Sequence, residues 1–366
     1  MDPHDIVREV SPTRIPRAQG LRLEATDSIA ALAPEWATLA ASTGNVFATP
    51  EWAEAWMDTL GHGASPRLVV GRDAARRLRL VIPLVLVHRG PLRVARFMGH
   101  GVADLQGPIA APGTDFKSQA VEQLMVDILK DYDVFLGERI PASLEWEGMP
   151  GVRILHREVN PLLPLREWGN WETYLASRSR RLRRELRHDE RVLAARHALS
   201  VRLTTDPERL QADLDVLFAL HRARFGNQSS FAPREEFHRR FATLALARGW
   251  LRLWILEADG RPAAARYDFS YGGVYHAYNG GRHPDWSRLS VGLVLRKFSL
   301  QSAFSERATA YRFLRGGESY KGRFGTVDDP IVTVAASGTW LGRVALAVAY
   351  SLRSSSRIRG LVRMRL

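Results

Sequence analysis

The sequence predicts an α/β (α+β) protein of two domains, and three observations carry this prediction. The chain has 366 residues, which is long enough for two domains with separate cores. Segments with strand-like patterns alternate along it with segments whose apolar residues have helical spacing. Near the middle, residues 161–169 contain two prolines and a glycine, which is typical of a domain boundary.

These patterns divide the chain into four parts. We expect a loose N-terminal arm at 1–20, a first domain at 21–165, a second domain at 166–330 and a basic amphipathic tail at 331–366. The arm is polar and contains three acidic residues and three prolines, so it is not expected to be a signal peptide. No apolar run reaches about 18 residues, so no spanning helix is expected. A cytoplasmic protein is predicted, with peripheral attachment to the inner face of the membrane as the alternative.

The first domain begins with a strand at 21–25 and a helix at 28–43. Thr49 and Pro50 then form a strong helix start, a capping residue followed by proline at the first helical position. Trp52 and Trp56 fall on one face of this helix, where core packing is favoured over a wall for stacking a substrate. Strands are expected at 67–71, 78–88, 92–98, 134–136 and 152–155, and a helix at 116–131. The loop 99–104 is predicted to be a hydrogen-bonded turn, with a polar-substrate site as the alternative.

The second domain opens with a basic helical stretch at 171–195. It carries seven arginines against a stripe of leucines: Arg178, Arg180, Arg181, Arg183, Arg184, Arg187 and Arg191. A solvated basic face is one interpretation, and a phosphate- or nucleic-acid-binding surface is the other. Helices follow at 207–225 and 234–248. Strands at 251–257 and 262–271 form a hairpin through Asp259 and Gly260, a favoured short turn.

The stretch from 271 to 325 reads as strand, loop, helix, strand and loop. Gly272 and Gly273 predict a tight turn into a strand at 274–278, followed by a polar loop at 279–285. Ser290 is expected to cap a helix that ends near 305, before a strand at 311–314. A basic, glycine-containing loop that opens a helix favours a diphosphate. The predicted cofactor-binding residues are Arg288, Leu289, Ser290, Val291, Gly292 and Leu293.

Composition narrows the chemistry. The chain has no cysteine, which excludes disulfides and thiolate metal sites, and no metal is expected. The formal net charge is +13, almost all of it from arginine. This bias reflects either genomic base composition or anionic partners. Nucleophile-elbow, His-Glu-x-x-His and Walker-type motifs are absent from the sequence.

Residues 21–329 resemble the CelD-like acetyltransferases of cellulose biosynthesis in the GNAT superfamily, and the related FemAB-type transferases. Short motifs in a specific order carry this resemblance: Thr49-Pro50-Glu51-Trp52, Arg180-Arg181-Leu182-Arg183-Arg184, Leu220-His221-Arg222-Ala223-Arg224-Phe225, Pro284-Asp285, Arg288-Leu289-Ser290-Val291-Gly292 and Arg315-Gly316-Gly317-Glu318-Ser319-Tyr320-Lys321-Gly322-Arg323-Phe324-Gly325. The resemblance implies tandem GNAT-like folds, each a mixed, largely antiparallel sheet flanked by helices.

The resemblance also implies acyl transfer from a thioester, with acetyl-CoA or a longer acyl-CoA as co-substrate. The resemblance would place its pyrophosphate on Arg288 to Leu293. The residue pattern at the helix start favours the same segment. The superfamily loop usually has two glycines, whereas this chain has Ser290 and Gly292. A small-molecule, lipid or polysaccharide-precursor acceptor is implied. Nucleic acid is not expected, apart from tRNA in the aminoacyl-transfer alternative.

Acyl transfer needs a base and a donor for the leaving thiolate. Glu318 and His276 are the candidate bases, and Tyr278, on the same strand face as His276, is the candidate acid. Each has a structural alternative: a buried hydrogen-bonded His or Tyr, and a Glu that orients Lys321 or Arg315. The resemblance places Lys321 in acceptor or phosphate binding, with an exposed lysine as the alternative. The motifs add Arg315, Tyr320, Arg224 and Arg181 as substrate-binding candidates.

The tail contains no acidic residue and six arginines. Its apolar segment 340–352 is too short to span a bilayer, so residues 340–366 either bind a membrane interface or dock on the core as a last helix. Three functions stay open: an acyl-CoA-dependent N- or O-acyltransferase of envelope, lipid or exopolysaccharide metabolism, a FemAB-like aminoacyl-tRNA-dependent transferase, and a non-catalytic membrane- or nucleic-acid-binding protein.

Overall fold

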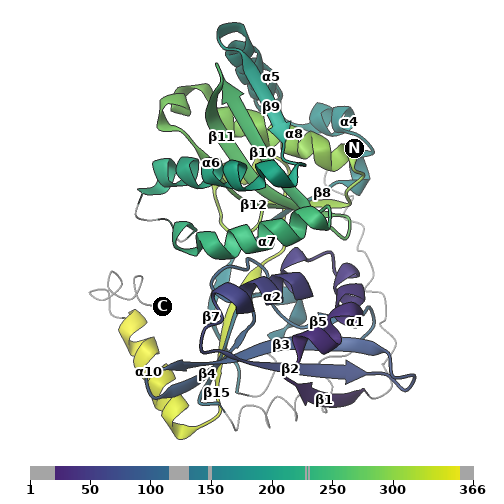
Figure 1. The fold of residues 1–366 in the computed structure, drawn as a ribbon, viewed down its shortest axis with the longest axis vertical. Helices are drawn as coiled ribbons and strands as arrows, with labels where there is room; N and C mark the ends of the chain where they lie inside the picture. The colour runs from purple at the N-terminus through teal and green to yellow at the C-terminus, as the bar shows by residue number, and fades with distance from the viewer. Residues whose placement is uncertain (1–20, 115–131, 147–150, 227–228, 230, 355–366) are drawn as a thin grey trace, which may run out of the picture.

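The computed structural model describes residues 21–114, 132–146, 151–226, 229 and 231–354. The predicted arm, the predicted helix 116–131 and residues 355–366 lie outside this part of the chain. The described residues form two mixed, largely antiparallel sheets with helices packed on them (Figure 1). The predicted fold class is confirmed.

The first sheet has the strand order β1-β2-β3-β4-β6-β15-β7, with β5 paired to β3. Its strands are β1 (Arg22–Thr26), β2 (Ser65–Arg72), β3 (Leu78–Arg89), β4 (Leu92–Phe97), β5 (Ile109–Ala110), β6 (Val134–Pro141), β7 (Arg153–Glu158) and β15 (Ile331–Ser337). Among the described strand pairs of this sheet, only β4 and β6 run parallel. The late strand β15 returns from the second half and lies between β6 and β7. Residues 331–337, expected in the tail, therefore complete the first sheet.

The second sheet has the order β14-β8-β13-β12-β11-β10-β9. Its strands are β8 (Pro161–Pro164), β9 (Leu199–Leu203), β10 (Leu251–Ala258), β11 (Arg261–Tyr271), β12 (Val274–Arg282), β13 (Ala310–Arg312) and β14 (Val327–Asp328). The strand β8, from the stretch read as a boundary, pairs with β13 and β14. Again a single described pair, β12 with β13, is parallel.

The described helices are α1 (Ile29–Ala41), α2 (Pro50–Thr59), α4 (Trp171–Ser177), α5 (Arg180–Arg196), α6 (Pro207–Phe225), α7 (Glu235–Ala247), α8 (Val291–Ser305), α9 (Ser319–Gly322) and α10 (Trp340–Ser354), with the 3-10 turns η1 (Val46–Ala48) and η7 (Pro284–Leu289) among the shorter elements. The basic stretch 171–195 is two helices, because Arg178 is extended and the hydroxyl of Ser179 caps α5 by accepting from the Leu182 amide at 3.3 Å.

Several local signals are confirmed. The Thr49 hydroxyl accepts a hydrogen bond from the Trp52 amide at 3.2 Å and so caps α2. Asp259 and Gly260 turn the β10–β11 hairpin with φ of +52° and +73°. Gly272 and Gly273 turn the β11–β12 hairpin in the same left-handed region, with φ of +54° and +76°. Both turns match the twist of antiparallel strands.

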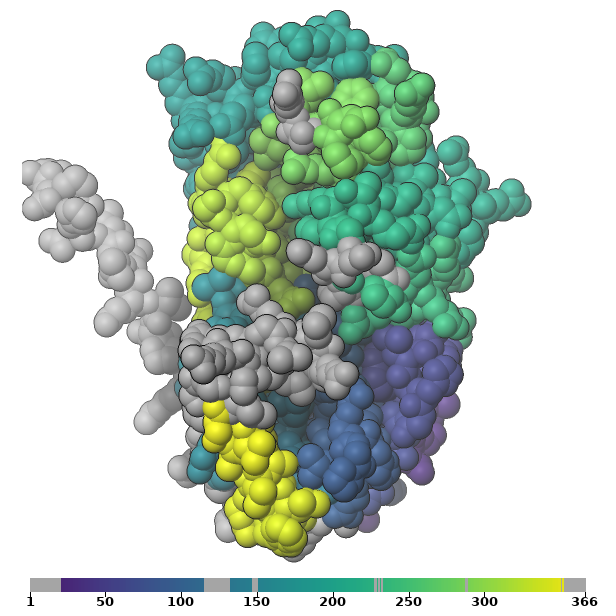
Figure 2. Space-filling model, turned by 90° about the vertical axis from the view of Figure 1, so that its left-hand side faces the viewer, coloured from purple at the N-terminus to yellow at the C-terminus, as the bar shows by residue number. Residues whose placement is uncertain are grey.

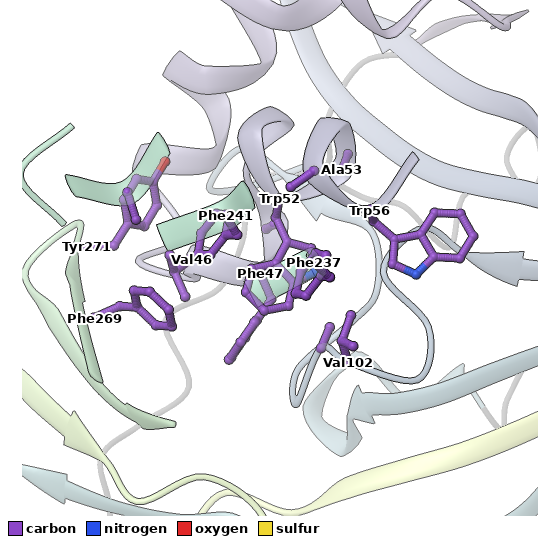
Figure 3. Close-up of a cluster of buried hydrophobic side chains, with 14 of the residues drawn as sticks. Val46, Phe47, Trp52, Ala53, Trp56, Val102, Phe237, Phe241, Phe269 and Tyr271 are labelled. Atoms are coloured by element: carbon purple, nitrogen blue, oxygen red, sulfur yellow. The ribbon is translucent and has the colours of Figure 1, made fainter. Parts of the chain in front are cut away.

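One continuous core joins the two domains. Trp52 of α2 lies edge-on to Phe237 and Phe241 of α7, at ring-centroid distances of 4.8 and 4.5 Å (Figure 3). Figure 1 shows α7 and α2 facing each other between the two sheets. Trp52 and Trp56 are both buried, which confirms their core role. The contact fixes the second domain against the first.

The β11–β12 turn also docks on the first domain. A Cβ added to Gly272 would lie 2.7 Å from the carbonyl oxygen of Ala41, at the end of α1. This position therefore requires glycine for its positive φ and for its close backbone contact. The turn that begins β12 is thus anchored outside its own sheet.

Replacing Trp52 with alanine tests the joint core. We expect Trp52→Ala to lower the free energy of unfolding by about 3–5 kcal/mol, because a large buried side chain leaves a cavity. Denaturant unfolding followed by tryptophan fluorescence and circular dichroism measures this loss. Trp340→Ala removes an exposed indole and should change stability by less than about 0.5 kcal/mol. Equal losses in the two variants would contradict the assignment of Trp52 to the joint core.

Candidate active site

The pairing of β12 with β13 stops early. Three residue pairs join the strands, and the last is His276 with Arg312. Beyond it Leu314, with φ of +58°, turns its chain away, while β12 continues to Arg282 on β11 alone. The β12 edge from 277 to 282 therefore has no strand partner on this side among the described residues. Such an edge can pair with an extended ligand, although the Gly280 amide donates to the Asn279 side chain at 2.8 Å.

A register shift bends β12 where the strands part. Asn279 pairs with Tyr267 and His276 with Phe269, so Ala277 and Tyr278 together face the single residue Asp268. This is the geometry of a β-bulge, which bends its strand and redirects its side chains. The bend carries the second part of β12 away from β13.

The segment predicted as a polar loop at 279–285 is largely strand. A Cβ on Gly281 would lie 2.4 Å from the backbone nitrogen of His221, and one on Gly280 would lie 2.7 Å from the carbonyl oxygen of Ala265. These glycines therefore allow β12 to lie directly beneath α6 and beside β11. Close packing against α6 and β11, and not a turn, therefore explains the glycines in this segment.

A buried polar network supports the bulge. Arg266 donates two hydrogen bonds to Asp268, at 2.9 and 2.7 Å. The hydroxyl of Ser299 on α8 donates to Asp268 at 2.7 Å and lies 2.9 Å from the Tyr311 hydroxyl of β13. The network ties β11, β13 and α8 together. Because a buried charge that loses its partner is strongly destabilising, this network holds the parting strands in place.

The helix α8 begins directly after η7. Ser290 takes the left-handed conformation, with φ of +48°, and its side chain does not cap the helix as predicted. Its carbonyl oxygen instead accepts from the amides of Leu293 and Val294, at 2.7 and 3.1 Å. A Cβ on Gly292 would meet no atom within 4 Å, so the described fold leaves room there. The first turn of this helix can bind an anion.

Positive charge gathers beside this helix start. Partial burial and the nearby guanidinium of Arg282 lower the pKa of Arg224, with Arg296 adding to the effect. The Arg296 guanidinium also donates to the Tyr320 hydroxyl at 3.0 Å and lies over its ring. Three arginines from α6, β12 and α8 therefore surround one region, where a multiply charged phosphate would be stabilised.

The first domain reaches the same strand. The Tyr278 hydroxyl donates to the carbonyl oxygen of Val102 at 2.6 Å. Arg315 forms an ion pair with Asp104 at 2.9 Å, and Arg139 lies 3.6 Å from the same carboxylate. Burial raises the pKa of Asp104, although the two arginines oppose this shift. The loop 99–104 is thus part of the junction between the domains.

Glu318, which directly precedes α9, and Lys321 on α9 form one unit. The Lys321 ammonium, only 3% exposed, donates to the carbonyl oxygens of Leu314, Arg315 and Gly316 at 3.0, 2.8 and 3.0 Å. It also lies 2.8 Å from the Glu318 carboxylate. Since an ammonium has three protons, this environment favours a role in holding the 314–316 turn over the predicted binding of acceptor or phosphate.

The Glu318 carboxylate is accessible and ionised. Although burial opposes the shift, the hydrogen bond from Lys321 holds the pKa of Glu318 below its usual value. Its side chain is 57% exposed and lines an open pocket with Val159, Ser319 and Asp328. The position fits a carboxylate that receives a proton from a bound acceptor.

The environments of His276 and Tyr278 differ. His276 is 0% exposed, neither ring nitrogen has a hydrogen-bond partner among the described residues, and burial lowers its pKa to about 3. This environment disfavours the predicted base role. Burial and the Asp104 carboxylate raise the pKa of Tyr278, so its phenol stays protonated. Both rings contact Phe47, which confirms that they share one face of β12.

The other predicted site residues are distributed unequally. Arg224 and Tyr320 lie in the arginine-rich region beside α8, and Arg315 lies at the domain junction. Arg181 lies on α5 with an 80% exposed side chain and pairs with Glu185. Arg288 falls in η7, before the helix start.

Sequence reasoning missed Asp104, Arg139, Arg282 and Arg296 as site residues. Only the His-and-Asp loop 99–104 gave a signal, and there the turn interpretation was preferred. The other three gave none, because an arginine in an arginine-rich chain stands out only when its neighbours in space are known. No group of three or more His, Asp or Glu residues suited to a metal ion occurs within the described part of the chain.

The family model for the acetyltransferase (GNAT) domain matches residues 180–322, which contain β12, α8, β13 and α9. The match covers the second domain and identifies residues 180–322 as similar to GNAT acetyltransferase domains. No protein with curated annotation matches the chain by sequence.

Solved structures show that the tandem GNAT fold extends over most of the chain. FemX is 12% identical, and the similarity covers 86% of this chain and 97% of FemX with a TM-score of 0.60. A tandem GNAT protein of the clavulanic acid biosynthesis pathway is 14% identical, with 87% and 99% covered and a TM-score of 0.53. The C-terminal domain (DUF2156) assigned to a lysylphosphatidylglycerol synthetase of Agrobacterium fabrum is 12% identical, with 89% and 98% covered and a TM-score of 0.54.

Lys321 offers a test of the α9 unit. We expect Lys321→Met to lower the free energy of unfolding by about 1–3 kcal/mol, because three carbonyls lose their donor. Urea unfolding measures the loss. Arg240→Met breaks an exposed ion pair with Asp58 and should cost about 0–1 kcal/mol. Unchanged stability in Lys321→Met, with a raised KM, would instead assign Lys321 to ligand binding.

Proposed function

We propose that this protein transfers an acyl group from acyl-CoA to an amine or hydroxyl of a cell-envelope, lipid or polysaccharide-related acceptor. The observation that carries the proposal is the free edge of β12 from 277 to 282, which leads into the first turn of α8. An extended thioester arm can pair with that edge while its diphosphate reaches the helix start. The GNAT domain match supports the reaction class.

The residues present fit such a donor. The helix start supplies backbone amides and the positive end of a helix dipole. Arg224, Arg282 and Arg296 add positive charge beside it. Gly292 leaves room for a phosphate close to the backbone. Acyl-CoA would supply a thioester carbonyl, and the residues at the bulge, Ala277 and Tyr278, would lie beside it if the donor paired with β12.

The reaction needs little covalent participation by the protein. The acceptor nitrogen or oxygen attacks the thioester carbonyl and loses a proton, and the thiolate leaves with a proton. A β12 amide at the bulge can donate to the oxyanion. Glu318, held ionised by Lys321, receives the acceptor proton, and the thiolate takes its proton from solvent. The raised pKa of Tyr278 and its hydrogen bond to the Val102 carbonyl disfavour the predicted acid role. His276 is left in the core.

The acceptor would approach between the domains. Asp104 and Arg139 form a largely buried charged group at this junction, and Arg315 is its more exposed member. The motifs shared with CelD-like and FemAB-type transferases favour an envelope or polysaccharide precursor. An aminoacyl-tRNA donor remains the second candidate, because Arg181, Arg184 and Arg187 on α5 are exposed.

Isothermal calorimetry with acetyl-CoA, a long-chain acyl-CoA and free CoA tests the donor site. We expect micromolar binding of at least one of them. Gly292→Asp should weaken it at least about tenfold more than Gly292→Asn, because the two side chains match in shape and differ in charge at the helix start. Arg288→Ala measures the contribution of the preceding basic residue.

No binding of any CoA species would contradict the acyl-CoA donor. Aminoacyl-tRNA binding with a steep salt dependence would then establish the second candidate, because counterion release scales with the phosphates contacted. If Gly292→Asp and Gly292→Asn weakened CoA binding equally, the diphosphate would not bind at the start of α8.

Glu318→Gln tests the base. We expect kcat to fall about 10²–10⁴-fold with unchanged CoA affinity, because the amide accepts no proton. Because the pKa of Glu318 lies below its usual value of 4.5, the carboxylate is ionised at any pH well above 4.5. A rate increase with pH between about 6 and 9 therefore reports the acceptor amine and should remain in the variant. A variant with full kcat would remove Glu318 from the mechanism.

A further inference from the structure

The helix α10 presents apolar side chains to solvent. Trp340, Val344 and Val348 are 68%, 51% and 52% exposed. Their spacing of four residues places them on one face of the helix. The other large exposed hydrophobic residues of the described chain, Val159, Phe225 and Val327, lie apart from one another in the sequence. A contiguous apolar stripe at a surface marks an interaction site.

The first turn of α10 is anchored, so the stripe cannot be buried by rotating the helix. The Thr339 hydroxyl accepts from the Gly342 amide at 3.2 Å and donates to the Asp133 carboxylate at 2.8 Å. The Gly338 amide donates to the Asp133 carbonyl at 3.1 Å. A Cβ on Gly342 would lie 1.7 Å from that carbonyl oxygen, so the helix packs directly on backbone.

Charge identifies the occupant of this surface. Arg343 is exposed beside Val344, and residues 331–366 contain six arginines and no acidic residue. A two-fold dimer through the stripe would bring the Arg343 side chains of two copies together, which is unfavourable. An anionic bilayer instead satisfies both features, because apolar side chains and an indole enter its interface while arginines meet the headgroups.

We propose that the α10 stripe, Trp340, Val344 and Val348 with Arg343, docks the protein on an anionic lipid surface. No helix among the described residues is long and apolar enough to cross a membrane, so this contact is peripheral. Figure 2 shows α10, in yellow, on the same face as the yellow-green segment that includes α9. Docking through α10 therefore turns this face of the molecule toward the lipid surface.

Flotation of the full chain with vesicles tests this proposal. We expect binding to phosphatidylcholine vesicles that contain phosphatidylglycerol, weak binding to phosphatidylcholine alone, and release at high salt. Val344→Asp with Val348→Asp should weaken binding at least tenfold. Thr38→Asp with Ala212→Asp makes the same charge change at exposed positions on α1 and α6 and should retain binding.

Val344→Ser with Val348→Ser removes apolar surface without adding charge and should also weaken binding. Thermal unfolding should be the same in all variants, since the altered side chains are exposed. Vesicle binding retained by both α10 variants, or no binding by the full chain, would overturn the proposal. A concentration-dependent dimer abolished by the α10 variants would do the same, by assigning the stripe to a second copy. The assay needs no substrate, so its outcome is independent of acyl transfer.

Discussion

The site depends on one constraint, the short pairing of β12 with β13. After His276 and Arg312 the two strands part, because Leu314 turns one chain away and the bulge opposite Asp268 bends the other. A full-length pairing would close the β12 edge. The buried Arg266–Asp268 pair and Ser299 stabilise the sheet where β12 and β13 separate. The opening is thus built into the rigid part of the sheet.

The two domains act as one body around that opening. Trp52 fills the space between them with apolar contacts, and Gly272 fixes the start of β12 to the end of α1. Beyond the bulge, Tyr278 and Arg315 reach Val102 and Asp104 of the first domain. The first domain therefore contributes a wall to the junction where the acceptor would enter.

The sequence predicted what depends on neighbours along the chain. The Thr49 cap and the two glycine turns depend on local hydrogen bonding and on φ, so the sequence predicts them correctly. The sequence predicts a loop at Gly280 and Gly281, whereas they lie in β12. Both glycines are needed because α6 and β11 pack closely on them, and these elements lie far away in the sequence. Ser290 was read as a side-chain cap, although its left-handed φ is set by the entry from η7.

The roles of single site residues were harder to predict. A lysine in a basic loop suggested an anion, yet its position beneath three carbonyls favours a structural role. His276 had a suitable reference pKa, and only burial removes it from that range. The arginine-rich region beside α8 could not be predicted from the sequence, because its three arginines come from separate elements. Tertiary proximity, absent from the sequence, decides each of these cases.

The central claim is that the donor lies along the free edge of β12. Hydrogen exchange with mass spectrometry, with and without acyl-CoA, tests it most directly. We expect slower exchange in peptides covering 277–282 and 290–294, with little change in the first sheet. Tight binding that leaves these peptides unchanged and protects another region would contradict it.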